Sequence, residues 1–323
     1  ESLFLPRNTS PLGNEKVSMS LVKRSHRRGT LNTSLLLAFV FLCLLGAFLH
    51  RASWLGPSSS VGNINDFTLA KEESFGFFDD IPKKDWLRRK ALSRTRMHDV
   101  NFEPRTFRGH IAASAPYHQL NWDPDFSCSF KDLVGDKWLC DPHRLENRPC
   151  LVLSVGPNPD FMFERALAKM HPHCEIHTFD PASREMEDLP PSVHHHAIGI
   201  KPSYEMNRKV AAVKTVFMQR RRWDVPEKTL GELQKELKLQ DRQVSILSVD
   251  CTGCEWYTYK DFLKIGAQQM VLEMHETPGN RNETMFDMHN AGYVIVHKDP
   301  EFDMSGGAYT QYTMVKLAKS FFE

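Results

Sequence analysis

From Cys150 onward the chain alternates between short apolar runs and amphipathic stretches, and this alternation restricts the fold more than any other feature of the sequence. Runs of about four to eight apolar residues that end in Gly, Asp or Pro are typical of buried strands, whereas apolar residues about three or four positions apart are typical of helices. Strands that alternate with helices favour a mostly parallel sheet with helices on both faces. The sequence therefore predicts an α/β domain.

The expected elements follow from the same patterns. Strands are predicted at 151–155, 175–179, 193–200, 244–249 and 270–274, and helices at 161–170, from 229, at 255–265 and at 282–290. Two further strands, 293–297 and 309–317, are separated by a loop that contains Gly306 and Gly307. Their closeness favours an antiparallel pair at the edge of the sheet.

The residues that close the first two strands are candidates for ligand binding, because ligands bind at the carboxyl ends of the strands in such sheets. Gly156 closes the first strand and Asp180 closes the second. This spacing suits a turn that lets a nucleotide approach, followed by a carboxylate that accepts two ribose hydroxyls. An Asp180 side chain that binds backbone in a turn before Pro181 is the alternative. A single glycine in this turn disfavours a dehydrogenase, whose fingerprint has three.

Four segments together carry a resemblance to a known family. They read CLVLSVGPNPDFMFE at 150–164, HTFDP at 177–181, SVDCTGCEW at 248–256 and LEMH at 272–275. In this order they resemble the methyltransferase-like protein 24 family, which is related to the FkbM-type methyltransferases. The resemblance implies a Rossmann-like, seven-stranded class I methyltransferase domain over residues 121–323 that binds S-adenosylmethionine as its cofactor.

The resemblance also implies roles for individual residues. The cofactor-binding residues would be Gly156, Asn158 and Asp160 beside the methionine part and Asp180 at the ribose, and the catalytic residues would be Asp250, Glu255 and His275. Glu255 and His275 are the first candidates for a general base that removes a proton from the methyl acceptor. Each has an alternative structural role: His275 as a strand-end histidine bonded to backbone, and Glu255 as a cap near the N-terminus of the following helix. The acceptor, a small molecule or a protein, is not identified by the sequence.

The loop after residue 250 departs from the family pattern. Thr252 stands where the family has an acidic residue, so a catalytically inactive binding module that keeps the fold is an alternative function. Cys251 and Cys254 form a C-x-x-C motif, for which we predict a structural bridge or two buried thiols. The run His194–His196 does not suit one metal ion, because consecutive strand residues point to opposite faces, and no metal ligands are assigned.

The N-terminal part predicts membrane attachment. Residues 29–49 carry no charge, and the first 50 residues hold six Lys and Arg against two acidic residues, with the basic ones before the apolar run. This pattern predicts a cytosolic basic tail (1–30), a transmembrane signal anchor (31–50), and a linker and stem (51–120) with one short helix near 85–96. The chain is then a single-pass type II membrane protein whose domain faces the secretory lumen or the cell exterior. A cleaved signal peptide is the alternative.

Cysteine usage suits that compartment. Six cysteines follow the apolar run, an even number, and disulfides form in an oxidising lumen. Six cysteines allow 15 connectivities. We favour a bridge between Cys128 and Cys140, while several of the others are open to a role as buried thiols. Asn282, which begins Asn-Glu-Thr, is a candidate glycan acceptor.

Two further partner classes can be weighed from the sequence. A net charge of +1 without a basic stripe disfavours a nucleic acid partner. A type II anchor with a lumenal α/β domain also describes Golgi glycosyltransferases, and Asp123-Pro124-Asp125 imitates their D-x-D metal motif. This segment precedes the first core strand, so we interpret it as a turn centred on the proline.

Overall fold

The computed structural model describes residues 66–94, 110–156, 160–181, 188–205, 226–278, 280–303 and 305–323. The predicted cytosolic tail, the predicted anchor at 31–50 and the candidate cofactor residue Asn158 lie outside these residues. Among the residues that are described, no helix combines the length and the apolar character needed to cross a membrane.

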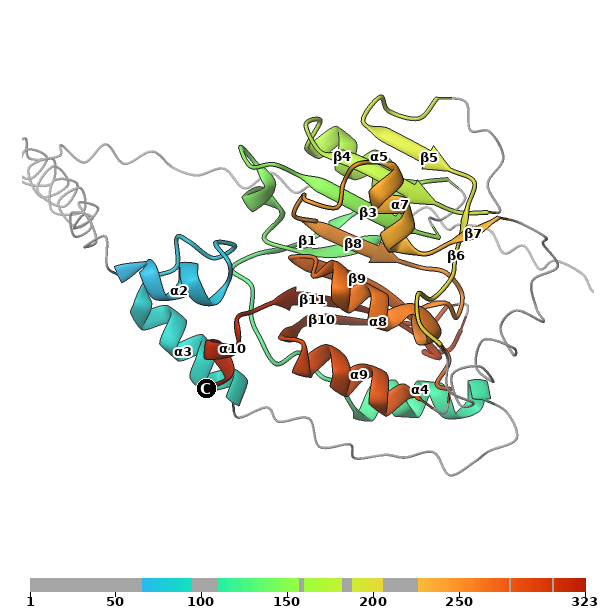
Figure 1. The fold of residues 1–323 in the computed structure, drawn as a ribbon. Coiled ribbons are helices and arrows are strands. Elements are labelled where there is room, and N and C mark those ends of the chain that lie inside the picture. Colours follow the sequence, from blue (N-terminus) through green and yellow to red (C-terminus); the bar gives the residue numbers. More distant parts are fainter. Residues whose placement is uncertain are drawn as a thin grey trace, which may run out of the picture. The chain divides into compact units, whose positions relative to one another are not determined.

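A mixed sheet of seven strands forms the centre of the domain (Figure 1). Its strands are β3 (Leu151–Val155), β4 (Glu175–Phe179), β5 (Val193–His196), β8 (Ile246–Val249), β9 (Gln269–His275), β10 (Tyr293–Glu301) and β11 (Tyr309–Lys316). They lie in the order β10-β11-β9-β8-β3-β4-β5, and all neighbours are parallel except the two pairs that involve β11. The chain runs outward from β3 through β4 to β5 and then crosses to β8 and β9, so the strand order reverses between β3 and β8. Ligands bind at such a reversal in open α/β sheets.

The predicted Rossmann-like α/β fold is confirmed, with two differences in the strands. The strand expected at 193–200 ends at His196, and Gly199–Ile200 (β6) pairs instead with Glu227–Lys228 (β7) because the backbone N–H of Ile198 turns back to the carbonyl oxygen of His196. The last two strands are antiparallel as predicted, but β11 lies between β9 and β10 and β10 forms the edge. An unbroken run of buried residues in β11 suits this inner place, since inner strands are covered on both faces.

Alternate residues of the strands pack on opposite layers. On one face, Leu153 belongs to the same hydrophobic cluster as Trp256 of α8 (Glu255–Ile265), together with α7 (Leu230–Glu236) and α9 (Arg281–Asn290). On the other face, Val152 packs with Leu167 of α5 (Met162–Met170). The hairpin β1–β2 (Lys131–Val134 and Lys137–Cys140) shares this second layer, with Val134 and Leu139 in the same cluster.

A third hydrophobic cluster joins the start of the described chain to its end. It includes Trp86 of α3 (Lys83–Arg94), Val294 of β10 and Phe321 of α10 (Lys319–Phe322). The Trp86 indole donates a hydrogen bond of 2.5 Å to Glu73, the last residue of α2 (Thr68–Glu73). The helix α4 (His110–Leu120) lies beside β10 and β11. Part of the expected stem is therefore folded onto the sheet, and α3 is the short helix predicted near residue 85.

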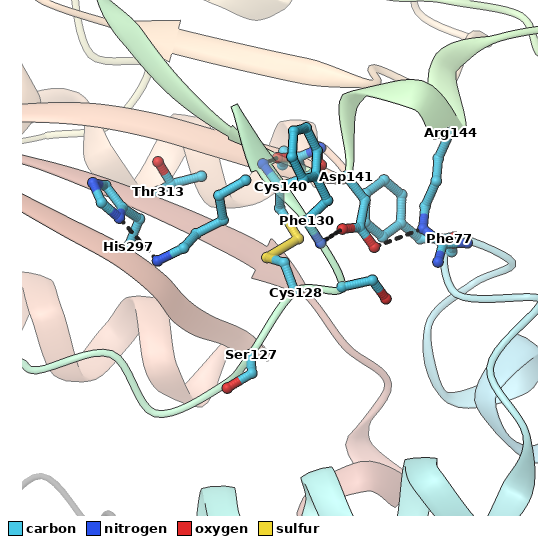
Figure 2. Close-up of a disulfide and its surroundings, with 12 residues drawn as sticks. Phe77, Ser127, Cys128, Phe130, Cys140, Asp141, Arg144, His297 and Thr313 are labelled. Atoms are coloured by element: carbon cyan, nitrogen blue, oxygen red, sulfur yellow. Dashed lines mark hydrogen bonds and ion pairs between the residues drawn. A yellow bond between two sulfur atoms is a disulfide. The ribbon is translucent and has the colours of Figure 1, made fainter. Parts of the chain in front are cut away.

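Three disulfides join the six cysteines of the described domain. The favoured pair, Cys128 with Cys140, is confirmed and attaches the segment before the hairpin to the end of β2 (Figure 2). Beside it, the Asp141 carboxylate accepts a hydrogen bond from the backbone of Phe130 and another from Arg144. The other two bridges are Cys150–Cys174 and Cys251–Cys254.

The D-x-D segment is a structural turn. Asp125 is buried and accepts the backbone N–H of Ile295 at 2.7 Å, whereas Asp123 pairs with Lys298. The two carboxylates thus hold the turn against β10. In the candidate glycan acceptor, the Asn282 side chain lies in α9 and accepts a hydrogen bond from the Tyr117 hydroxyl.

Candidate active site

The turn at Gly156 follows β3 and lies against the end of β8. Gly156 has φ +68°, and its backbone N–H donates to the carbonyl oxygen of Phe179 at 2.9 Å. A Cβ at this position would lie 2.9 Å from the Cα of Cys251 and still nearer the carbonyl oxygen of Asp250. Glycine is therefore required both by the positive φ and by the close backbone approach at the reversal of strand order.

Two of the predicted cofactor carboxylates also lie at the carboxyl-terminal ends of the parallel strands. Asp180 directly follows β4 and is partly exposed, and its backbone N–H donates to the carbonyl oxygen of His196. Asp160 is exposed just before α5, where its carboxylate accepts the backbone N–H of Met162 at 3.3 Å. Because β3 and β4 are neighbours in the sheet, Gly156 and Asp180 stand side by side at adjacent strand ends.

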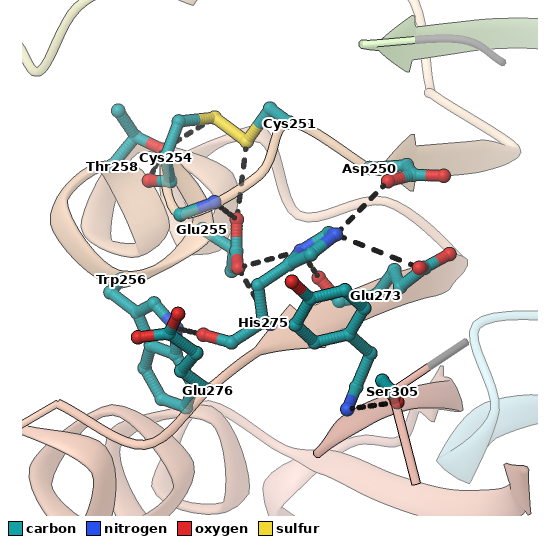
Figure 3. Close-up of polar contacts among 12 residues, drawn as sticks. Asp250, Cys251, Cys254, Glu255, Trp256, Thr258, Glu273, His275, Glu276 and Ser305 are labelled. Atoms are coloured by element: carbon teal, nitrogen blue, oxygen red, sulfur yellow. Dashed lines mark hydrogen bonds and ion pairs between the residues drawn. A yellow bond between two sulfur atoms is a disulfide. The ribbon is translucent and has the colours of Figure 1, made fainter. Parts of the chain in front are cut away.

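A cluster of charged side chains lies at the ends of β8 and β9 (Figure 3). His275 Nε2 is 3.6 Å from Asp250 Oδ1 and 3.6 Å from Glu273 Oε1. Its Nδ1 is 3.1 Å from Glu255 Oε1. The structure thus brings the three predicted catalytic residues together and adds Glu273, which belongs to the same face of β9 as His275.

Glu255 is fully buried and its carboxylate binds protein groups on both oxygens. Oε1 accepts the backbone N–H of His275 at 2.8 Å, and Oε2 accepts the backbone N–H of Gly253 at 2.8 Å. Glu255 is also the first residue of α8, where a negative charge is favoured by the helix dipole. These contacts make it a residue that orients His275 and the loop, so it is badly placed to reach an acceptor.

The surroundings of His275 favour the imidazolium form. Burial opposes the charge, but Glu255, Asp250 and Glu273 together raise the pKa of His275 to about 9. The ring lies against Tyr309, with ring centroids 4.6 Å apart, and the Trp256 indole donates to the His275 carbonyl oxygen. At neutral pH His275 is therefore protonated and offers a proton instead of accepting one.

Lys137 completes the cluster from the hairpin. Its Nζ lies 2.9 Å from Asp250 Oδ2, 3.1 Å from Glu273 Oε2 and 3.4 Å from Asp136 Oδ2. Burial disfavours the ammonium form, but the carboxylates of Asp250, Glu273 and Asp136 raise the pKa of Lys137 far beyond its usual value. Sequence reasoning missed this residue, because it precedes the alternating pattern and no motif includes it.

The two carboxylates that Lys137 bridges differ in their environments. Burial opposes ionisation of Asp250, but Lys137 and His275 hold its pKa below the usual range. Burial and the charge of Asp250 raise the pKa of Glu273, against the opposing effects of Lys137 and His275. Both side chains keep about a fifth of their surface exposed. A pair of carboxylates whose environments separate their pKa values is typical of an acid–base site.

The loop between Asp250 and α8 is short and cross-linked. The Cys251–Cys254 disulfide closes it, as one of the two structures predicted for the C-x-x-C motif. Thr252, at the position where the resembled family has an acidic residue, is exposed with φ +50°. The histidine run 194–196 lies in β5, away from the charged cluster at the ends of β8 and β9. His196 Nε2 is 3.0 Å from His177 Nδ1.

Two comparisons with known proteins find similarities. A family model described as a methyltransferase domain matches residues 68–316. A protein from Agrobacterium tumefaciens described as a predicted O-methyltransferase is 11% identical, and the match covers 54% of this chain and 77% of that one with a TM-score of 0.32. The antibiotic-resistance methyltransferase Kmr is also 11% identical, and the match covers 58% of this chain and 100% of that one with a TM-score of 0.30. Among curated proteins no significant match is found.

Proposed function

We propose that this chain, which belongs to the methyltransferase domain family, transfers a methyl group from S-adenosylmethionine to an acceptor held over the ends of β8 and β9. One observation carries the proposal most: the glycine turn and Asp180 lie at adjacent strand ends, next to the charged cluster of Asp250, Glu273 and His275. A cofactor site and an acid–base site thus share one edge of the sheet. The four motif segments also support a place near the methyltransferase-like protein 24 family.

The residues at the glycine turn fit S-adenosylmethionine. Gly156 lets the turn after β3 lie close against the end of β8, and the partly exposed Asp180 carboxylate beside it suits the two ribose hydroxyls. Asn158 and Asp160 are proposed beside the methionine part, as the resemblance implies. When bound, the sulfonium supplies an electrophilic methyl group, so the protein's task is to align an acceptor and to remove its proton.

We assign proton removal to the pair Asp250 and Glu273. Glu255 is buried with both oxygens engaged, and His275 is protonated at neutral pH, so neither suits a general base. The Glu273 side chain is about one-fifth exposed, and its pKa is raised toward neutral pH, as suits a general base. The imidazolium of His275 then positions both carboxylates.

Calorimetric titration of the full chain with S-adenosylmethionine tests the cofactor assignment. The wild type should bind at one saturable site, and Asp180→Ala should weaken binding by about ten- to a hundredfold, since it removes hydrogen bonds to a charged group. Asp241→Ala is a matched control, because Asp241 is exposed in the loop that precedes β8 at the opposite edge of the sheet. Equal affinity of the two variants would refute the role of Asp180.

A transfer assay separates an enzyme from a binding module. The chain, loaded with S-adenosylmethionine that carries a labelled methyl group, should pass label to candidate small-molecule or protein acceptors. Label that never leaves the cofactor, with binding intact, would favour the inactive binding module that Thr252 suggests.

We also propose that residues 31–50 anchor the chain and that the domain lies on the secretory side. The basic residues before the apolar run support this orientation, and three disulfides in the described domain suit an oxidising compartment. In sealed microsomes the domain should resist added protease until detergent is present. Digestion without detergent would contradict the proposed topology.

A further inference from the structure

We propose that Lys137 is the resident cation of the acceptor site and supplies the positive charge that a divalent metal ion would otherwise bring to Asp250 and Glu273. Asp250 and Glu273, which contact Lys137, form a cage of possible metal ligands together with His275. One ligand atom from each of them lies within 4.8 Å of the others. Two carboxylate oxygens and an imidazole nitrogen are a donor set that suits first-row divalent metals.

The cage has the arrangement of a metal site once His275 releases its Nε2 proton, since metal ligands are deprotonated. Glu255 binds His275 through Nδ1, which leaves Nε2 facing Asp250 and Glu273. A carboxylate behind a histidine ligand is the usual second layer of a metal site, where it fixes the orientation of the ring.

The ammonium group of Lys137 neutralises the two carboxylates of this cage through Asp250 Oδ2 and Glu273 Oε2, whereas His275 Nε2 lies 3.6 Å from Oδ1 and Oε1 of the same side chains. The side chain of Lys137 is only 5% exposed. The third contact is an ion pair with Asp136 at 3.4 Å. A cation and its counter-charges are thus built into the chain itself.

The hairpin holds Lys137 in place. A Cβ on Gly135 would overlap the backbone of Met162 at the start of α5, so the turn is packed tightly there. On the β2 side, the backbone N–H groups of Trp138 and Cys140 donate to the side chains of Gln311 and Gln269 at 2.9 and 3.0 Å. The hairpin around Lys137 is therefore fixed against α5 on one side and against β9 and β11 on the other.

A fixed ammonium group gives the acceptor site two properties. It keeps the carboxylates of Asp250 and Glu273 oriented toward the exposed ends of the strands. It also balances their negative charge without a bound metal ion. The second consequence, that acceptor binding needs no divalent metal, rests on the proposed methyl-transfer function, whereas the cage itself does not. Lys137 acts here as a positioning residue, since it acts through Asp250 and Glu273.

Substitution of Lys137 tests the proposal with Mn²⁺ as the probe. Lys137→Met removes the ammonium group and keeps much of the apolar stem, and Lys137→Arg keeps a positive charge in the cage. Mn²⁺ binding to the full chain is measured by calorimetry and by the loss of the free-ion electron paramagnetic resonance signal. Lys137→Met should gain one saturable site that the wild type and Lys137→Arg lack. The double variant Lys137→Met, Glu273→Gln should lose that site again.

A second readout covers the case in which Lys137→Met is unstable, since removing one partner of a buried ion pair leaves uncompensated charge. Mn²⁺ should then raise the melting temperature of Lys137→Met and leave that of Lys137→Arg unchanged, because a ligand of the folded state stabilises it. The proposal is overturned if the wild type binds Mn²⁺ as tightly as Lys137→Met does and the single variant Glu273→Gln loses that binding. It is equally overturned if Lys137→Met neither binds Mn²⁺ nor is stabilised by it. Parallel titration of the wild type with S-adenosylmethionine shows separately whether the proposed function fails.

Discussion

Replacement of Gly156 by Ala is expected to destabilise the domain by about 2–5 kcal/mol, because two costs combine at this position. A residue with a Cβ pays roughly 1–2 kcal/mol at a left-handed φ. Overlap of the new methyl group with the backbone of Asp250 and Cys251 adds about 1–3 kcal/mol, since neither strand end can move freely. The same shift would separate the glycine turn from the end of β8, so S-adenosylmethionine affinity should fall together with stability.

Gly306 provides the matched control. It has φ +62°, but a Cβ there would meet nothing within 4 Å. Gly306→Ala should therefore cost only the conformational share, about 1–2 kcal/mol. Urea unfolding of both variants measures the difference, and equal losses would show that the close approach of Gly156 to Asp250 has no energetic weight.

Replacement of Glu255 by Gln should have an effect of similar size. The substitution keeps the shape of the side chain but removes the negative charge that faces His275 at 3.1 Å. Breaking a buried charge pair costs up to about 3–5 kcal/mol, and Asp250 and Glu273, each 3.6 Å from His275 Nε2, compensate part of the remaining charge. The pKa of His275 should fall from about 9 at the same time, as Glu255 is the main group that raises it against burial.

The pH dependence of stability follows from the sign of this shift. The pKa of His275 is raised in the folded chain above its ordinary value of 6.5, so its contribution is fully present below pH 6.5 and is lost as the pH rises through about 9. NMR titration of the histidine Cε1 resonances measures the pKa directly. His118 and His196, whose pKa values burial lowers to about 3 and about 4, titrate well away from it. A pKa of His275 near 6.5 in the wild type, or one unchanged in Glu255→Gln, would contradict the charge arrangement described above.

Local pattern was enough to predict most of the sheet. Strands such as 151–155 and 175–179 have the predicted bounds, because short apolar runs closed by Gly or Asp leave few other structures. The meeting of Asp250 and His275 was also predictable, since carboxyl ends of parallel strands share one edge. The place of β11 inside the sheet was not, because strand order depends on packing between distant segments.

The role of individual side chains was harder to predict. Glu255 reads as a base from its place in the motif, and its complete burial depends on α8 packing against β9. Lys137 is separated from Asp250 by 113 residues and from Glu273 by 136, so no local pattern links them. One signal was present: a lysine beside Trp138 in a short hairpin whose next residues, Leu139 and Cys140, are apolar and fix the strand in the core.

A structure of the full chain with S-adenosylhomocysteine tests the central claim most directly, because this demethylated product should occupy the cofactor site without reacting. The account predicts ribose hydroxyls bound to the Asp180 carboxylate, the ligand against the Gly156 turn, and its sulfur facing the cluster of Asp250, Glu273 and His275. A ligand bound elsewhere on the chain, or one whose ribose does not contact Asp180, would contradict it.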